Sequence, residues 1–143
     1  MRMSDGQPSQ VDGLEIRLPA NADQIPVARR AVADFCELYG LPAPLVDDVK
    51  LVVTEACTNV VLHAYEGSGN GMIEIDASSE GDELVLLVRD QGPGMTPSPL
   101  GEGLGLGLPL IAALTSSLTI VEPEGGGTEV SMTFALHDVA NEP

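Results

Sequence analysis

The chain has few basic residues. Six lysines and arginines stand against 22 aspartates and glutamates, so the formal net charge is -16. This charge disfavours binding to nucleic acid and to anionic membrane surfaces, because both present phosphate groups. A protein partner with a basic surface is compatible with it. An anionic small ligand would need a cation or backbone dipoles to offset the repulsion.

Aromatic residues are also scarce, at 3 % with no tryptophan, whereas hydrophobic residues make up 43 % of the 143 positions. We therefore expect one domain with an aliphatic core. Cys36 and Cys57 fall in helical patterns and are expected to be buried free thiols. No metal-ligand cluster follows from two cysteines and two histidines at unrelated spacings. The polar N-terminus lacks a signal peptide pattern and no run is long enough to span a membrane, so we expect a cytoplasmic protein.

Hydrophobic periodicity predicts three helices and five strands between a flexible tail at 1–12 and another at 138–143. The domain itself is expected over 13–137. The helices are expected over about 21–39, 44–64 and 105–114, and the strands over 14–18, 73–77, 84–88, 118–121 and 128–134. This order favours an α+β fold, a two-layer sandwich whose mixed, mostly antiparallel sheet carries the helices on one face.

The second predicted helix carries an acid and an amide four positions apart. Glu55 and Asn59 share one face of that helix, beside an apolar stripe that includes Val52, Val53 and Ala56. One interpretation is that both side chains lie on the solvated side. The other is that they have a partner, since polar groups beside an apolar stripe are costly without one. That partner could be a protein group, a metal or a ligand.

Asp90 ends the central predicted strand. By the period of two, it shares the core-facing side with Leu86 and Val88. A carboxylate there can accept hydrogen bonds from a planar amine in a pocket. Gly92 and Gly94 would let the backbone pass close to a flat ring. An ordinary turn capped by aspartate explains the same residues about equally well.

A glycine-rich run, 101–107, precedes the third predicted helix. Free backbone N–H groups at a helix N-terminus favour phosphate, although such a run can also be a simple connector. Thr128 lies on the same sheet face as Val130 and Met132. Its hydroxyl could reach the same pocket, or it could be an ordinary strand threonine.

Four motifs together resemble the Bergerat ATP-binding fold of histidine kinases, gyrase-type topoisomerases and mismatch-repair ATPases. The likeness covers about 14–136. The motifs are Thr54-Glu55-Ala56-Cys57-Thr58-Asn59 with His63-Ala64-Tyr65, Asp90-x-Gly92-x-Gly94-Met95, Gly103-x-Gly105-x-Gly107 and Gly127-Thr128. Within that fold, the first motif and the short chain resemble the bacterial anti-sigma-factor serine/threonine kinases of general-stress and sporulation switches.

The resemblance implies roles for individual residues. Glu55 would be the general base that takes the proton of a target serine, and Asn59 would hold Mg²⁺. Asp90 would bind the adenine amine of ATP, helped by Thr128 through water. Gly92 and Gly94 would line the adenine, and Gly103, Gly105 and Gly107 would wrap the phosphates. Met95, Leu104 and Leu106 are expected to be further nucleotide-binding positions.

The resemblance also implies a regulatory function. The protein would phosphorylate an anti-anti-sigma antagonist and sequester a sigma factor. A homodimer is expected, since Val85 and Leu87 fall on the sheet face opposite the helices. One feature departs from related kinases: no lysine or arginine lies between Gln91 and Leu110, where a cation can contact the terminal phosphate. A nucleotide-gated binding protein with little kinase activity is therefore the alternative.

Overall fold

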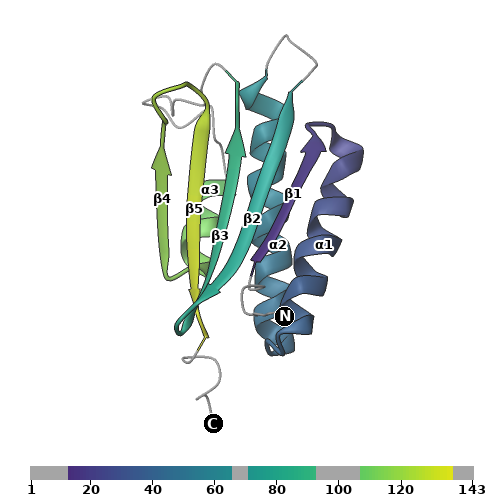
Figure 1. The fold of residues 1–143 in the computed structure, drawn as a ribbon, viewed down its shortest axis with the longest axis vertical. Helices are drawn as coiled ribbons and strands as arrows, with labels where there is room; N and C mark the ends of the chain where they lie inside the picture. Colours follow the sequence, from purple (N-terminus) through teal and green to yellow (C-terminus); the bar gives the residue numbers. More distant parts are fainter. Residues whose placement is uncertain (1–12, 66–70, 93–106, 137–143) are drawn as a thin grey trace, which may run out of the picture.

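The computed structural model describes residues 13–65, 71–92 and 107–136, so both predicted tails lie outside the described residues. Figure 1 shows the elements in chain order. The strands are β1 (Gly13–Pro19), β2 (Met72–Glu80), β3 (Glu83–Asp90), β4 (Ser117–Val121) and β5 (Thr128–Ala135). The helices are α1 (Ile25–Leu38) after a 3₁₀ turn (Ala22–Gln24), α2 (Ala43–Asn59), a π-helical turn (Val60–Ala64) and α3 (Gly107–Leu114).

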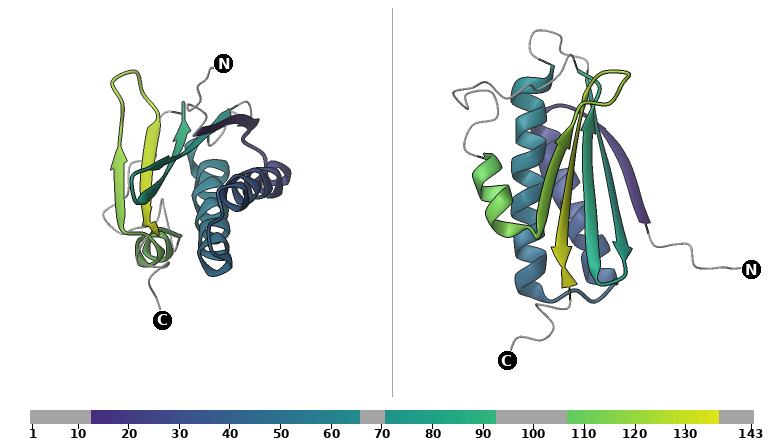
Figure 2. Two further views of the ribbon diagram at one scale, coloured as in Figure 1. Left: turned by 60° about the horizontal axis from the view of Figure 1, so that its bottom comes forward. Right: turned by 90° about the vertical axis from the view of Figure 1, so that its left-hand side faces the viewer.

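The five strands form one sheet in the order β1-β2-β3-β5-β4. All four pairings between these strands are antiparallel. The helices cover one face and leave the other open, as the two views in Figure 2 show. The expected two-layer α+β fold is therefore confirmed, whereas the sheet, which was expected to be mixed, is antiparallel throughout the described strands. Because β5 lies between β3 and β4, the end of β3 meets the start of β5, and Asp90 pairs with Thr128.

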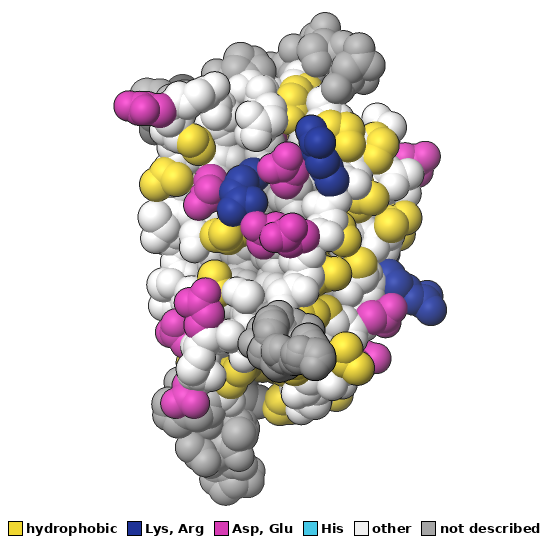
Figure 3. All heavy atoms as spheres, in the orientation of Figure 1, with side chains coloured by type: hydrophobic (Ala, Val, Ile, Leu, Met, Phe, Trp, Pro, Cys, Tyr) yellow, Lys and Arg dark blue, Asp and Glu magenta, His cyan; other side chains and the backbone are white. Residues whose placement is uncertain are grey.

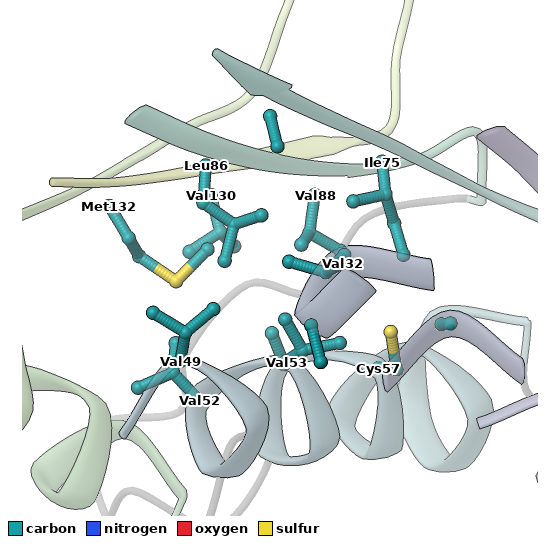
Figure 4. Packing of buried hydrophobic residues seen from close by; sticks show 14 of the residues in the cluster. Val32, Val49, Val52, Val53, Cys57, Ile75, Leu86, Val88, Val130 and Met132 are labelled. Carbon is teal, nitrogen blue, oxygen red and sulfur yellow. The ribbon is translucent and has the colours of Figure 1, made fainter. Parts of the chain in front are cut away.

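The core between the two layers is aliphatic. Along β3, buried and partly exposed residues alternate, which confirms the predicted inward side. Figure 4 shows Val49 and Val53 of α2 facing Leu86 and Val88 of the sheet. Cys57 lies in the same core. Burial of the thiols raises the pKa of Cys36 to about 11 and that of Cys57 to about 12, so both stay protonated at neutral pH.

A glycine ends α1 and turns the chain toward α2. Gly40 has a φ of 76°, as expected for a residue that follows the last helical turn. The Leu41 N–H donates to the Cys36 carbonyl at 3.1 Å, and the Gly40 N–H donates to the Glu37 carbonyl at 3.0 Å. These bonds satisfy the last carbonyls of α1. They set the two helices side by side against the sheet.

The second helix changes its winding near its end. It was expected to run as one helix to about Ala64, but it is α-helical only to Asn59 and π-helical from Val60. A π turn holds one more residue than an α turn and occurs often at functional sites. It brings Ala64 and Tyr65 to the same end of the sheet as Asp90, as their contacts below show. In the described part of the chain, no helix is long and apolar enough to cross a bilayer.

Gly127→Ala is expected to destabilise the fold more than its neighbour Gly126→Ala. Both glycines have positive φ, 87° and 99°, so alanine would add about 1–2 kcal/mol of left-handed strain at either position. A Cβ at position 126 would have no heavy atom within 4 Å, whereas one at 127 would overlap the Asp90 carbonyl oxygen. That overlap should cost a further ~1–3 kcal/mol. Urea unfolding of both variants checks this, and equal losses would contradict it.

Candidate functional site

A buried carboxylate forms the centre of the site. Asp90 is 2 % exposed. Its Oδ1 accepts a hydrogen bond from the Gly92 N–H at 2.9 Å, but its buried Oδ2 has no partner among the residues that the structure describes. Burial raises the pKa of the Asp90 carboxyl, and backbone hydrogen bonds from Gly92 and Thr128 act in the opposite direction. The structure therefore leaves one costly acceptor oxygen ready for a donor.

A small pocket lies beside Asp90, between the sheet and the helices. Its walls come from two helices and two strands. They are formed by Ala56, Asn59, Leu108, Ile111, Ile120, Thr128 and Val130. Thr128 pairs with Asp90 across β3 and β5 and is 1 % exposed. The pocket encloses about 10 Å³ and is mostly apolar, with Asn59 and Thr128 as its polar residues, so it has room for a water-sized group rather than for a ring.

The two polar residues of α2 lie in different surroundings. Asn59 is 8 % exposed and lines the pocket, so the fully solvated interpretation is wrong for this residue. Glu55, one turn earlier, is partly exposed and can be reached from outside. The structure thus brings Asn59 and Thr128 together around the pocket. It leaves Glu55 nearer the surface.

Gly92 and Gly127 bring backbone segments into close contact at this site. A Cβ at Gly92 would overlap the Ala64 carbonyl, and one at Gly127 would overlap the Asp90 carbonyl. Packing of the chain against itself is thus sufficient to require glycine at both positions. Of the other predicted positions, Gly107 begins α3. Six more lie outside the described residues and therefore stay predictions: Gly94, Met95, Gly103, Leu104, Gly105 and Leu106.

Sequence reasoning assigned no role to Tyr65, which follows the π-helical turn. Its hydroxyl donates to the Met72 carbonyl at 2.7 Å and accepts a hydrogen bond from the Gln91 N–H at 2.6 Å. It thereby joins the end of the α2 segment to β2 and to the residue that follows Asp90. The only signal in the sequence was its place at the end of the His63-Ala64-Tyr65 motif.

Comparisons with known proteins agree with this fold. The family model described as the histidine kinase-like ATPase domain matches residues 18–134. The serine-protein kinase RsbW of Bacillus velezensis is 29 % identical over 145 residues, covering 90 % of this chain and 89 % of the relative. The anti-sigma F factor of Clostridium acetobutylicum is 31 % identical over 136 residues, covering 86 % and 94 %.

Solved structures show the same fold. The structure of the RsbU and RsbW domains of Rv1364c from Mycobacterium tuberculosis superposes with a TM-score of 0.69 at 25 % identity. The match covers 87 % of this chain and 32 % of that longer chain. The catalytic domain of the histidine kinase ThkA gives a TM-score of 0.52 at 15 % identity, covering 88 % of this chain and 97 % of that domain, which supports the fold alone.

Asp90→Asn is expected to raise the melting temperature of the ligand-free protein at pH 7. The pKa of Asp90 is higher in the folded state than in the unfolded chain, so the folded state binds the proton more readily. The stability of the protein therefore falls as the pH rises from the unfolded-state pKa of Asp90 to its folded-state pKa. The neutral amide removes this loss. The advantage should disappear in acid, where Asp90 itself is protonated. Thermal unfolding from pH 3 to pH 8 checks this, with the exposed Asp23→Asn as the matched control; a parent more stable than Asp90→Asn at pH 7 would contradict it.

Proposed function

Because the chain belongs to the histidine kinase-like ATPase family, we propose that it is an ATP-dependent protein serine kinase and an anti-sigma factor. In the cytoplasm it would phosphorylate an anti-anti-sigma antagonist and sequester a sigma factor. The support is that relatives named serine-protein kinase RsbW and anti-sigma F factor match nearly the whole chain. One name states a serine-protein kinase activity and the other an anti-sigma activity.

The observation that carries ATP binding is the unpartnered Oδ2 of Asp90. The exocyclic amine of adenine is a hydrogen-bond donor on a flat ring, and Oδ2 is an acceptor that has no partner among the described residues. Thr128, which pairs with Asp90, would help to hold the same edge of the ring through water. Gly92, Gly94 and Met95 would lie along the adenine.

The phosphates need other partners, because the chain carries a net charge of -16. The side-chain oxygen of Asn59 would hold Mg²⁺, which supplies positive charge next to the phosphates. The run Gly103, Leu104, Gly105, Leu106 and Gly107 would offer backbone N–H groups ahead of α3. Asn59 fits this role because it lines the pocket at the side of α2.

Glu55 would act as the general base. It is partly exposed one turn before Asn59, so a serine on a protein substrate can reach it. Glu55 would accept the hydroxyl proton as the serine oxygen bonds to the terminal phosphorus and the bond from that phosphorus to ADP breaks. Along α2, the residue proposed for proton transfer thus lies one turn before the residue proposed to hold Mg²⁺.

No lysine or arginine lies between Gln91 and Leu110, so the terminal phosphate lacks a cation from that segment. We infer that a basic residue of the bound antagonist or of a second protomer supplies one. Such an arginine raises transfer rates by about 10³–10⁵ in other systems. The isolated protein should then hydrolyse ATP very slowly, with a marked rise when the antagonist binds. The alternative is a nucleotide-gated binder that holds its partners without transferring phosphate.

Glu55→Gln is expected to keep the affinity for ATP and to abolish phosphorylation of the antagonist. A general base acts on the reacting hydroxyl, so its loss appears in the rate rather than in binding. Labelled Mg-ATP with and without the antagonist measures the transfer, and calorimetry measures the affinity. Glu83→Gln, at an exposed position at the start of β3, is the matched control.

Two results would contradict parts of this proposal. Equal turnover by Glu55→Gln and the parent would exclude Glu55 as the base. An antagonist that binds tightly to the parent at saturating Mg-ATP, but acquires no phosphoserine, would exclude the kinase and favour the nucleotide-gated binder.

The open face of the sheet is the surface that we propose for a homodimer. Val85 and Leu87 are partly exposed there. Arg89 on the same face pairs with Asp76 at 2.8 Å and with Glu129 at 2.9 Å. Figure 3 shows basic and acidic side chains next to one another on this face, with hydrophobic side chains around them. Because Arg89 is paired within its own chain, a second copy could cover the face without leaving the Arg89 charge buried and unpaired.

Light scattering is expected to give about twice the 14.9 kDa mass of one chain at micromolar concentration. Leu87→Glu should shift the mass toward that of one chain, since it places a charge on the proposed interface. Leu38→Glu is the control, because Leu38 is 79 % exposed on α1, away from the sheet. A parent that has the mass of one chain would exclude the dimer at that concentration.

A further inference from the structure

Tyr65 connects three segments that are distant in the sequence. Its hydroxyl lies 2.7 Å from the Met72 carbonyl at the start of β2 and 2.6 Å from the Gln91 nitrogen after β3. One hydroxyl can donate once and accept as well, so both of these bonds form together. The end of the π-helical turn is thereby tied to the segment that carries Asp90.

Two glycines fix the ring of Tyr65 as well as its hydroxyl. A Cβ at Gly71 would overlap the ring atoms. A Cβ at Gly92 would overlap the Ala64 carbonyl and lie 3.3 Å from ring atom Cδ1 of Tyr65. Neither Gly71 nor Gly92, the two backbone positions next to the ring, therefore has room for a side chain. Its orientation is set by packing and by hydrogen bonds at once.

These contacts continue to the carboxylate. The Gln91 N–H donates to Tyr65, and the next N–H, that of Gly92, donates to Asp90 Oδ1. With both amides engaged, the backbone after β3 is held, and it holds one carboxylate oxygen. The other oxygen, Oδ2, stays buried and has no partner within 13–65, 71–92 and 107–136.

We propose that Tyr65 is a positioning residue that aims Asp90 Oδ2 at the 6-amino group of adenine. It would thereby determine the preference for ATP over purine nucleotides that lack this amine. The inference rests on the proposed nucleotide-binding function and adds the residue that sets base selectivity. A tyrosine that only braces the fold would affect every nucleotide equally.

The test compares Mg-ATP with Mg-ITP, which has a keto oxygen in place of the 6-amino group. Calorimetry on the parent, Tyr65→Phe, Asp90→Asn and the double variant gives the affinities. Tyr65→Phe should weaken ATP binding by about 2- to 12-fold, the range for one neutral hydrogen bond, and ITP binding much less. In the Asp90→Asn background the same substitution should have little further effect on ATP, because Tyr65 acts through Asp90.

Two further variants complete the experiment. Tyr39→Phe removes the hydroxyl of the other tyrosine in the chain, which caps the C-terminus of α1, and should leave the ratio of ATP to ITP affinity unchanged. Gly71→Ala should displace the Tyr65 ring and lower that ratio as Tyr65→Phe does. If Tyr65→Phe does not fold, Gly71→Ala takes its place in the comparison.

The outcomes separate the inference from the function it rests on. A parent that binds neither nucleotide would exclude the proposed nucleotide site itself. A parent that prefers ATP, with a Tyr65→Phe variant that loses ATP and ITP affinity equally or loses neither, would leave the site in place and overturn the role of Tyr65. Full additivity of Tyr65→Phe and Asp90→Asn would overturn it too.

Discussion

The buried carboxylate of Asp90 is the constraint on which this end of the molecule depends. Its charge is costly in the core, and backbone N–H groups from Gly92 and Thr128 oppose that cost. The fold supplies these donors through the turn after β3 and the pairing of β3 with β5. One oxygen still lacks a partner in the described part of the chain, and a bound donor would relieve this unfavourable group.

The surrounding backbone is packed closely enough to keep that carboxylate in place. Gly71, Gly92 and Gly127 lie where a side chain would overlap Tyr65, Ala64 or Asp90. These contacts come from different parts of the chain and meet at one end of the sheet. Part of the glycine content of the site therefore reflects the approach of backbone to backbone. Direct contact with a nucleotide is a separate requirement, which the same glycines could also meet.

The two faces of the sheet differ in the charged groups that they carry. The helix-covered face holds an aliphatic core with Asp90 at its end, whereas the open face carries ion pairs such as those of Arg89. In a strongly acidic protein, a polyanionic ligand needs positive charge from elsewhere. Mg²⁺ at Asn59 and a basic partner would both provide it. Nucleotide binding and partner binding would then be linked by charge.

The sequence alone determined the features that depend on local periodicity. Alternation along β3 gave Asp90 its inward side, helical spacing brought Glu55 and Asn59 to one side of α2, and the scarcity of aromatics implied an aliphatic core. Only the tertiary structure decided the rest. The insertion of β5 beside β3, the unpartnered Oδ2 of Asp90 and the bonds of Tyr65 to Met72 and Gln91 join residues far apart in the chain. No local pattern encodes them, because such contacts form only when the helices pack on the sheet and bring those segments together.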